Sequence, residues 1–137
     1  MTRGTSRPSI ILFCAILCSV GCQRATTTEG PIAAPELAKR VGSGSAPVIL
    51  DVRTPAEYAA GHIPGSINIP HTELATRLAE IPGTKSTEIV VHCQAGRRAA
   101  TAEEILAQQG YTGVRDLQGH FGGWVQQGLP VEPAKTP

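Results

Sequence analysis

The chain has 137 residues, which is enough for one domain of ordinary size with short extensions at its ends. It carries 12 Lys and Arg residues against 11 Asp and Glu residues, a formal net charge of +1. This balance excludes the strongly basic surface that a nucleic-acid-binding domain presents, so we expect no nucleic-acid partner.

The first 21 residues have the layout of a secretory signal peptide. Arg3 and Arg7 form a basic start, residues 10–17 are almost wholly apolar, and small residues precede Cys22. The apolar stretch is shorter than the ~20 residues that a membrane-spanning helix needs. We therefore expect residues 1–21 to be a signal peptide that is cleaved before Cys22.

The end of this segment resembles a bacterial lipobox, in which the cysteine after a small residue is acylated and becomes the mature N-terminus. Ser19 stands where such sites usually have leucine, and Ser19 with Gly21 also fits an ordinary signal-peptidase site. The resemblance implies an exported, periplasmic protein whose only membrane contact is a lipid on Cys22. Gln23, in place of Asp, resembles the pattern that sorts such lipoproteins to the outer membrane of Gram-negative bacteria.

The four cysteines of the chain reduce to one free thiol. Cys14 and Cys18 leave with the signal peptide, and Cys22 is the expected lipid attachment point. Cys93 is then the only free thiol in an oxidising compartment. Without acylation of Cys22, a disulfide between Cys22 and Cys93 would block that thiol.

The rest of the chain divides into three parts. Residues 22–31 are polar and patternless, which is typical of a flexible tether. Residues 131–137 contain prolines and few apolar side chains, and we expect a disordered tail there. Residues 32–130 lie between them and form one domain near the commonest size.

The domain begins with a helical pattern over residues 35–41, followed by glycines and serines that end it. An apolar run over residues 48–52 predicts a buried strand. Residues 54–57 form a capping box with proline at the first helical position, so a helix starts there and ends near Gly61.

The remaining predicted elements continue the alternation: a strand at 66–69, a helix capped by Thr72 with apolar residues at one-face spacing to Ile81, a strand at 88–92, a helix at 98–109, a strand at 114–117 and a final helical turn at 122–127. This order predicts an α/β fold of three layers. Its central sheet would be mostly parallel, with about five strands and helices on both faces. Ligands of such sheets bind beyond the carboxyl ends of the strands, which is where Cys93 lies.

Cys93 is the candidate catalytic nucleophile. It follows an apolar strand and precedes a helix, where unpaired backbone N–H groups and the helix dipole favour a thiolate. Gly96 allows successive N–H groups to converge on an anion, and Arg97 and Arg98 add positive charge that can grip oxyanions. The candidate substrate-binding residues are Gln94, Ala95, Gly96, Arg97 and Arg98.

Three motifs in order resemble the rhodanese homology domain: residues 51–58 (DVRTPAEY) with 61–70 (GHIPGSINIP), residues 93–99 (CQAGRRA) as its active-site loop, and residues 119–124 (GHFGGW) with 128–130 (GLP) as its closing segment. The resemblance runs from Ile32 to about Pro130. The loop is most similar to that of small, single-domain periplasmic rhodaneses of the phage-shock type.

The resemblance implies a rhodanese-like fold and a thiosulfate sulfurtransferase. In such enzymes a cysteine takes sulfane sulfur from thiosulfate, or from a similar anionic donor, and holds it as a persulfide. It then passes the sulfur to cyanide or to a thiol, which can belong to a partner protein. No metal and no organic cofactor is required.

Two other functions compete with this interpretation. Protein tyrosine phosphatases and arsenate reductases also use a Cys-to-Arg cradle, but with five residues between the two. Here four residues, 94–97, separate Cys93 from Arg98, which makes the loop too tight for a tetrahedral phosphoryl group. The second alternative is a carrier or sensor module that holds a persulfide for a partner protein without turnover of its own.

Other polar residues have structural interpretations. We expect Asp51 and Arg53 to fix a strand end through hydrogen bonds, and Glu57 to serve the capping box. His71 and His120 lack the spacing of a metal site.

Overall fold

The computed structural model describes residues 30–133 of the chain. The predicted signal peptide, the Cys22 lipidation site and most of the predicted tether lie outside the described residues, as does the end of the predicted tail. Within the described part, no helix is both long and apolar enough to cross a membrane.

Four parallel strands form the central sheet: β1 (Val48–Asp51), β2 (Ile67–Asn68), β3 (Ile89–His92) and β4 (Val114–Asp116). Their order is β2-β1-β3-β4, so β1 and β3 are central. The sequence predicted about five strands. At the outer edge of β4, where a fifth strand would pair, Ile32 forms a single parallel bridge with Leu117.

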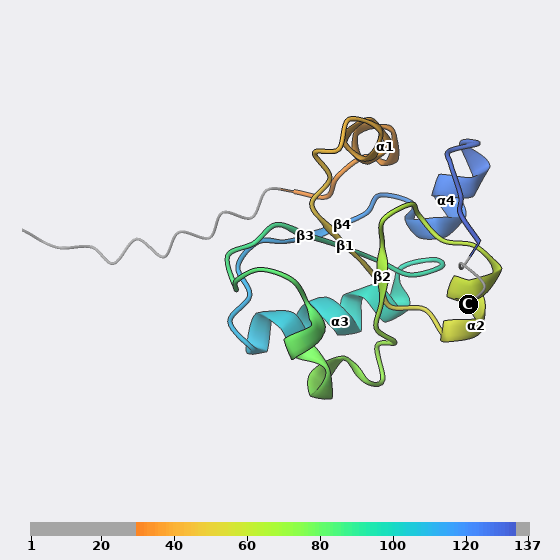
Figure 1. Cartoon of the computed structure of the whole chain (residues 1–137). Helices are drawn as coiled ribbons and strands as arrows, with labels where there is room; N and C mark the ends of the chain where they lie inside the picture. Colours follow the sequence, from red (N-terminus) through yellow and green to blue (C-terminus); the bar gives the residue numbers. More distant parts are fainter. Residues whose placement is uncertain (1–29, 134–137) are drawn as a thin grey trace, which may run out of the picture.

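Helices cover both faces of the sheet, as the sequence predicted (Figure 1). α1 (Ala34–Gly42) and α4 (His120–Gln126) pack on one face. α3 (Arg97–Gln108) covers the other face. The short helix α2 (Pro55–Ala60) follows β1 and buries none of its residues. The predicted three-layer α/β architecture is therefore confirmed.

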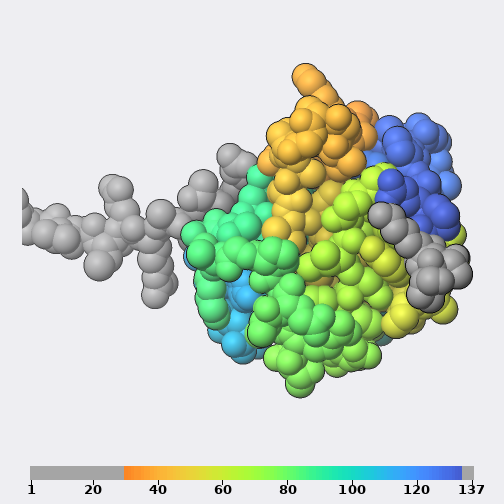
Figure 2. Space-filling view, viewed as in Figure 1, coloured from red at the N-terminus to blue at the C-terminus, as the bar shows by residue number. Residues whose placement is uncertain are grey.

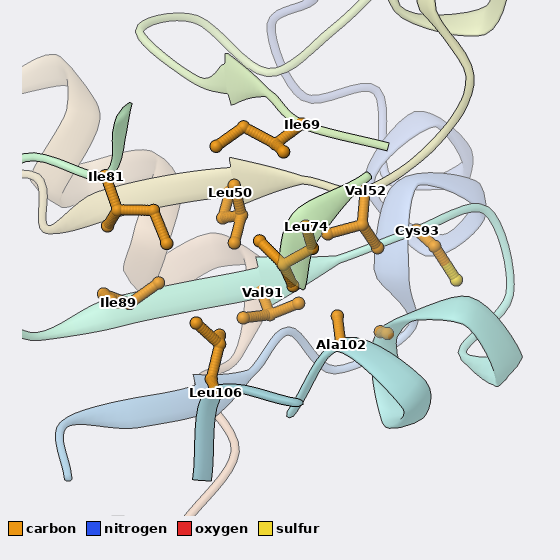
Figure 3. Packing of buried hydrophobic residues seen from close by; sticks show 11 residues of the cluster. Leu50, Val52, Ile69, Leu74, Ile81, Ile89, Val91, Cys93, Ala102 and Leu106 are labelled. Atoms are coloured by element: carbon orange, nitrogen blue, oxygen red, sulfur yellow. The ribbon is translucent and has the colours of Figure 1, made fainter. Parts of the chain in front are cut away.

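Alternation along the strands explains the two hydrophobic cores. Leu50 of β1 and Val91 of β3 face α3, whereas their neighbours Ile49 and Val90 face α1 and α4. Figure 3 shows the core on the α3 side, with Leu106 of α3 below β1 and β3. Because the sheet is covered on both sides, its central strands are apolar up to their last residues, Asp51 and His92, rather than alternating with polar residues.

The predicted helix capped by Thr72 is wrong. Residues 74–80 form two 3₁₀ turns, η1 (Leu74–Thr76) and η2 (Leu78–Glu80), separated by Arg77. No side chain caps either turn. The guanidinium of Arg77 pairs with carboxylates on both sides of it, 2.7 Å to each. This segment, green in Figure 2, buries Leu74 and Ile81 without a continuous helix.

All four strands point the same way, so their carboxyl ends share one edge of the sheet. The chain leaves β1 toward β2 on one side and leaves β3 toward β4 on the other. This reversal opens a crevice between the segments that follow β1 and β3, the usual ligand position in open α/β sheets. Cys93 directly follows β3 at this edge.

The described chain continues past the predicted domain end at Pro130. Glu132, which the sequence assigned to a disordered tail, forms an antiparallel bridge with His62. Both backbone hydrogen bonds of that bridge are present, at 2.8 and 2.9 Å. The first residues of the predicted tail are thus ordered against the turn that follows α2.

Candidate functional site

Cys93 is nearly inaccessible, with 1% of the residue exposed. Its sulfur turns toward the start of α3 (Figure 3) and accepts a hydrogen bond from the backbone N–H of Gly96 at 3.0 Å. Two further backbone bonds tie the loop to α4, from Phe121 N–H to the Cys93 carbonyl and from Gly122 N–H to the Gln94 carbonyl. The loop is therefore held at both its backbone and its sulfur.

Gly96 is the turning point of this loop. Its φ is +116°, a conformation that side-chain-bearing residues rarely adopt. A Cβ atom there would also lie 2.7 Å from Nε2 of His120, which packs against the loop from α4. Both constraints require glycine at this position. The bend at Gly96 places its N–H within hydrogen-bonding distance of the Cys93 sulfur, where an N–H donor stabilises negative charge.

Arg98 forms a two-bond ion pair beside the cleft. Its two terminal nitrogens donate to the two carboxylate oxygens of Glu57, at 2.6 and 2.8 Å. These bonds hold the pKa of Glu57 well below its usual range and raise the pKa of Arg98, with a smaller contribution to Arg98 from nearby Cys93. The sequence explained Glu57 by its capping box alone and did not reveal this pairing across 41 positions.

The capping box itself is present as predicted. The Thr54 hydroxyl accepts from the Glu57 N–H at 3.3 Å, and the Thr54 N–H donates to the Glu57 carboxylate at 3.0 Å. One carboxylate therefore serves both the start of α2 and the guanidinium of Arg98. The segment after β1 and the helix after β3 are joined across the crevice by this side chain.

A cleft of about 490 Å³ opens over the loop. Its lining residues are His71, Cys93, Gln94, Ala95, Arg97, Arg98 and Thr101. Four of the five predicted substrate-binding residues therefore lie together with Cys93, and the fifth, Gly96, holds the sulfur from beneath.

Sequence reasoning missed His71 and Thr101. His71 directly follows the segment that extends β2, and its N–H donates to the Val52 carbonyl at 3.2 Å. Its place after a parallel strand was the available signal, because all carboxyl ends meet at this edge. Thr101 lies one helical turn after Arg97, on the first part of α3.

Arg97 and Arg98 differ in their partners. Arg97 is exposed, and among residues 30–133 no carboxylate forms an ion pair with it. Arg98 is half-buried, and its charge faces Glu57. The charge of the Arg97 guanidinium is therefore not balanced by a carboxylate of the described residues, whereas that of Arg98 is largely balanced.

The buried polar residues beneath the site are structural. Arg53 grips both carboxylate oxygens of Asp51, at 2.6 to 3.0 Å, donates to the Gly61 carbonyl and lies over the Phe121 ring. These contacts fix the end of β1, as the sequence predicted. Burial lowers the pKa of His92 to about 4, so this residue is a neutral ring packed beside the ion pair.

No cluster of three or more metal-ligating side chains occurs within residues 30–133. His120 lies 3.5 Å from the Asp116 carboxylate, and His71 lines the cleft, but within residues 30–133 neither histidine belongs to such a cluster. The chemistry that this site offers is that of a shielded sulfur with an N–H donor and positive charge around it. Such a site suits nucleophilic attack on a small anion.

Comparison with known proteins agrees with this geometry. Residues 33–127 match the family model described as the rhodanese-like domain. A sulfurtransferase of Allochromatium vinosum is 37% identical over 95 residues, covering 69% of this chain and 87% of that protein. The human thiosulfate:glutathione sulfurtransferase is 35% identical over 108 residues, covering 70% of this chain and 93% of that protein.

Solved structures share the architecture. The Alr3790 protein of Anabaena sp. superposes with a TM-score of 0.69 at 29% sequence identity. The match covers 77% of this chain and 94% of that one. The fold described above is therefore the one found in these neighbours.

Proposed function

The chain belongs to the rhodanese-like domain family, and on this basis we propose that it is a sulfurtransferase in which Cys93 carries the transferred sulfur. One observation carries the proposal. The Cys93 sulfur accepts a hydrogen bond from Gly96 N–H at the base of an arginine-lined cleft. A sulfur in that position is placed to receive a second sulfur atom, and the N–H donor and the arginines stabilise the negative charge of the reacting groups.

We assign thiosulfate, or a similar anionic donor, to the first half-reaction. The Cys93 thiolate attacks the outer sulfur of thiosulfate and forms a new S–S bond. The old S–S bond breaks, and sulfite leaves with its electron pair. The charge of Arg97 favours entry of the dianion, and the Gly96 N–H stabilises negative charge on the sulfur that remains.

The second half-reaction returns the enzyme to its starting state. Cyanide or the thiolate of an acceptor attacks the outer sulfur of the persulfide, and the S–S bond to Cys93 breaks. Thiocyanate or an acceptor persulfide leaves, and the Cys93 thiolate is restored. The name of the human relative supports a thiosulfate donor and a thiol acceptor. The two steps balance without any metal, cofactor or external oxidant.

Phosphatase or arsenate reductase activity has less support. The loop is one residue short for a phosphoryl group, and Arg98 turns its terminal nitrogens to Glu57. We also propose that turnover occurs with small acceptors rather than only on a partner protein. The purified protein, assayed with cyanide and with small thiols, separates these functions, because a mere carrier shows no turnover with them.

We propose export as the context of this activity. The sequence favours a signal peptide over residues 1–21, acylation of Cys22 and anchoring to the periplasmic face of an outer membrane, in a protein of the phage-shock type. Intact-mass spectrometry of protein from membranes tests this. The expected mass is that of a chain beginning at Cys22 with acyl groups attached, and an uncleaved, unmodified chain would contradict it.

The first prediction concerns Cys93→Ser. Because serine has nearly the same size but cannot form a persulfide, thiocyanate production from thiosulfate and cyanide should fall to background. The melting temperature should change little. After thiosulfate treatment, intact-mass spectrometry should show the mass of one added sulfur atom on the wild type and none on the variant.

The matched control for this experiment is Thr101→Ser, a conservative change on the same cleft that leaves Cys93 in place. It should still acquire the extra sulfur. Thiocyanate formation that persists in Cys93→Ser would overturn the assignment of Cys93 as the sulfur carrier.

A further inference from the structure

The Glu57–Arg98 pair places a fixed negative charge beside the cleft where an anionic donor would bind. Arg98 lines the cleft together with Cys93, yet both of its terminal nitrogens donate to Glu57. Such a two-bond contact is geometrically specific and balances most of the guanidinium charge. A site built only to bind anions tightly would leave both of its arginines without a carboxylate partner.

The Glu57 carboxylate is itself held in place. The Thr54 N–H and hydroxyl both donate to the oxygen of Glu57 that also receives Arg98, at 3.0 and 2.8 Å. Glu57 also belongs to α2, which the capping box anchors directly after β1. The carboxylate is therefore part of the framework at the crevice and not a mobile surface group.

The balance of charge at the cleft then follows from named contacts. Arg97 lines the cleft, is exposed and has no carboxylate partner among the described residues, so its positive charge, although screened by solvent, is not cancelled. Arg98 and Glu57 together contribute close to none. Apart from the charge on the Cys93 sulfur itself, the cleft offers an anion one cation without a carboxylate partner, although two arginines stand in its loop.

We propose that Glu57 is a positioning residue that limits the affinity of the site for anions, so that thiosulfate binds but the sulfite product leaves readily. This inference rests on the proposed sulfurtransferase function. It adds that Glu57 acts through Arg98, which it holds beside the Cys93 sulfur with its charge balanced. The consequence is a preference for fast product release over tight donor binding.

The decisive variant is Glu57→Gln. Glutamine can replace glutamate in a capping box, so the start of α2 keeps its reciprocal hydrogen bonds. Its amide oxygen can still accept from one terminal nitrogen of Arg98, whereas its amide nitrogen is a donor and cannot accept from the other, and the negative charge is gone. We expect the KM for thiosulfate and the inhibition constant for sulfite each to fall about fivefold, because one cation of the cleft is no longer balanced. The kcat should fall as sulfite release slows.

Two further variants, one graded and one a control, are compared with Glu57→Gln. Glu57→Asp keeps a carboxylate at the capping position but is too short to reach both guanidinium nitrogens, so it should shift the same constants by less. Glu80→Gln removes the charge of a glutamate that pairs with exposed Arg77. It should leave the KM and the sulfite inhibition unchanged. If Glu57→Gln folds poorly, the Glu57→Asp series still tests the proposal.

A binding measurement separates this inference from the proposed function. In the Cys93→Ala background, where no sulfur can be transferred, titration calorimetry with sulfite should show about fivefold tighter binding when Glu57→Gln is added. Unchanged or weaker sulfite binding would overturn the role of Glu57, even if the wild type forms its persulfide normally. Failure of the wild type to form a persulfide would instead overturn the proposed function.

Discussion

Single residues at this site serve two purposes at once. Gly96 provides both the backbone bend and the hydrogen bond to sulfur, and Glu57 both caps α2 and binds Arg98. The first purpose of each was predictable, because a glycine in a loop and a capping box are local patterns. The N–H groups that converge on an anion at Gly96 were predicted as well. The Glu57–Arg98 contact was not, since it joins elements 41 positions apart.

The prediction at this scale is Gly96→Ala. Alanine must adopt a φ near +116° and bring its Cβ against the His120 ring, so we expect a loss of about 2 kcal/mol in unfolding free energy. The initial rate of sulfur transfer should also fall, by more than the loss of folded protein explains, because the Gly96 N–H moves away from the Cys93 sulfur. Chemical denaturation and initial rates measure the two effects.

Gly44→Ala is the control for this prediction. Gly44 also has a positive φ, +71°, but it lies between α1 and β1, and a Cβ atom added there would meet no other atom within 4 Å. It should lose about 1 kcal/mol of stability through backbone strain alone and keep full activity. Equal losses of activity in the two variants would contradict the role given to Gly96.

At the scale of elements, the sequence predicted the helices whose first and last residues are marked by local signals. α2 has its capping box, and α3 begins after the Gly96 bend and ends before Gly110, which has a φ of +84°. Residues 72–81 show the limit of such signals. Their apolar spacing fits a helix, but a stretch this short is marginal alone, and packing of Leu74 and Ile81 favours two separate turns instead.

The contact between α3 and β4 predicts a pH dependence. Glu103 of α3 is partly buried near Asp116 of β4, and burial, with a further contribution from Asp116, raises the pKa of Glu103 from 4.5 to about 7. The folded state thus binds this proton more tightly than the unfolded state. Stability should therefore fall as the pH rises from 4.5 to about 7.

Glu103→Gln should remove this dependence. Near pH 8 the variant should be more stable than the wild type by about 1 kcal/mol, a modest value because the side chain is partly exposed. Near pH 4 the two proteins should differ little. Thermal melts across the pH range measure this, with Glu104→Gln, an exposed neighbour on α3, as the control. A variant that gains most stability at low pH would contradict the assignment.

At the scale of the whole molecule, the alternation of strands and helices predicted a parallel sheet with two covered faces. It did not predict the strand order β2-β1-β3-β4, because pairing depends on contacts between distant segments. It also overestimated the number of strands in the sheet, about five against the four observed. Ile32 lies just before α1 and reaches the edge of β4 with one residue only, which a sequence pattern cannot distinguish from a short strand.

The two hydrophobic cores, one on each face of the sheet, predict how the stability losses of two core substitutions combine. Ile49 belongs to the core under α1 and α4, whereas Ile81 and Ile89 share the core under α3 (Figure 3). Each Ile→Val change should cost about 1 kcal/mol. Ile49→Val with Ile81→Val should be additive within about 0.5 kcal/mol, because the sheet separates the sites. Ile81→Val with Ile89→Val should depart from additivity, and equilibrium denaturation of all five variants decides between these outcomes.

Because Cys93 is almost fully enclosed, the rate at which its sulfur is chemically labelled reports local opening of the structure around it. A bulky alkylating reagent should reach that atom only when the surrounding structure opens, whereas a small reagent can enter through the cleft that Cys93 lines. The labelling rates of reagents of increasing size therefore report how often the site opens. Peptide mapping confirms that the label is on Cys93. Loading with a second sulfur atom would move the labelled atom, since the outer sulfur of a persulfide is itself a nucleophile and extends from Cys93 toward the cleft.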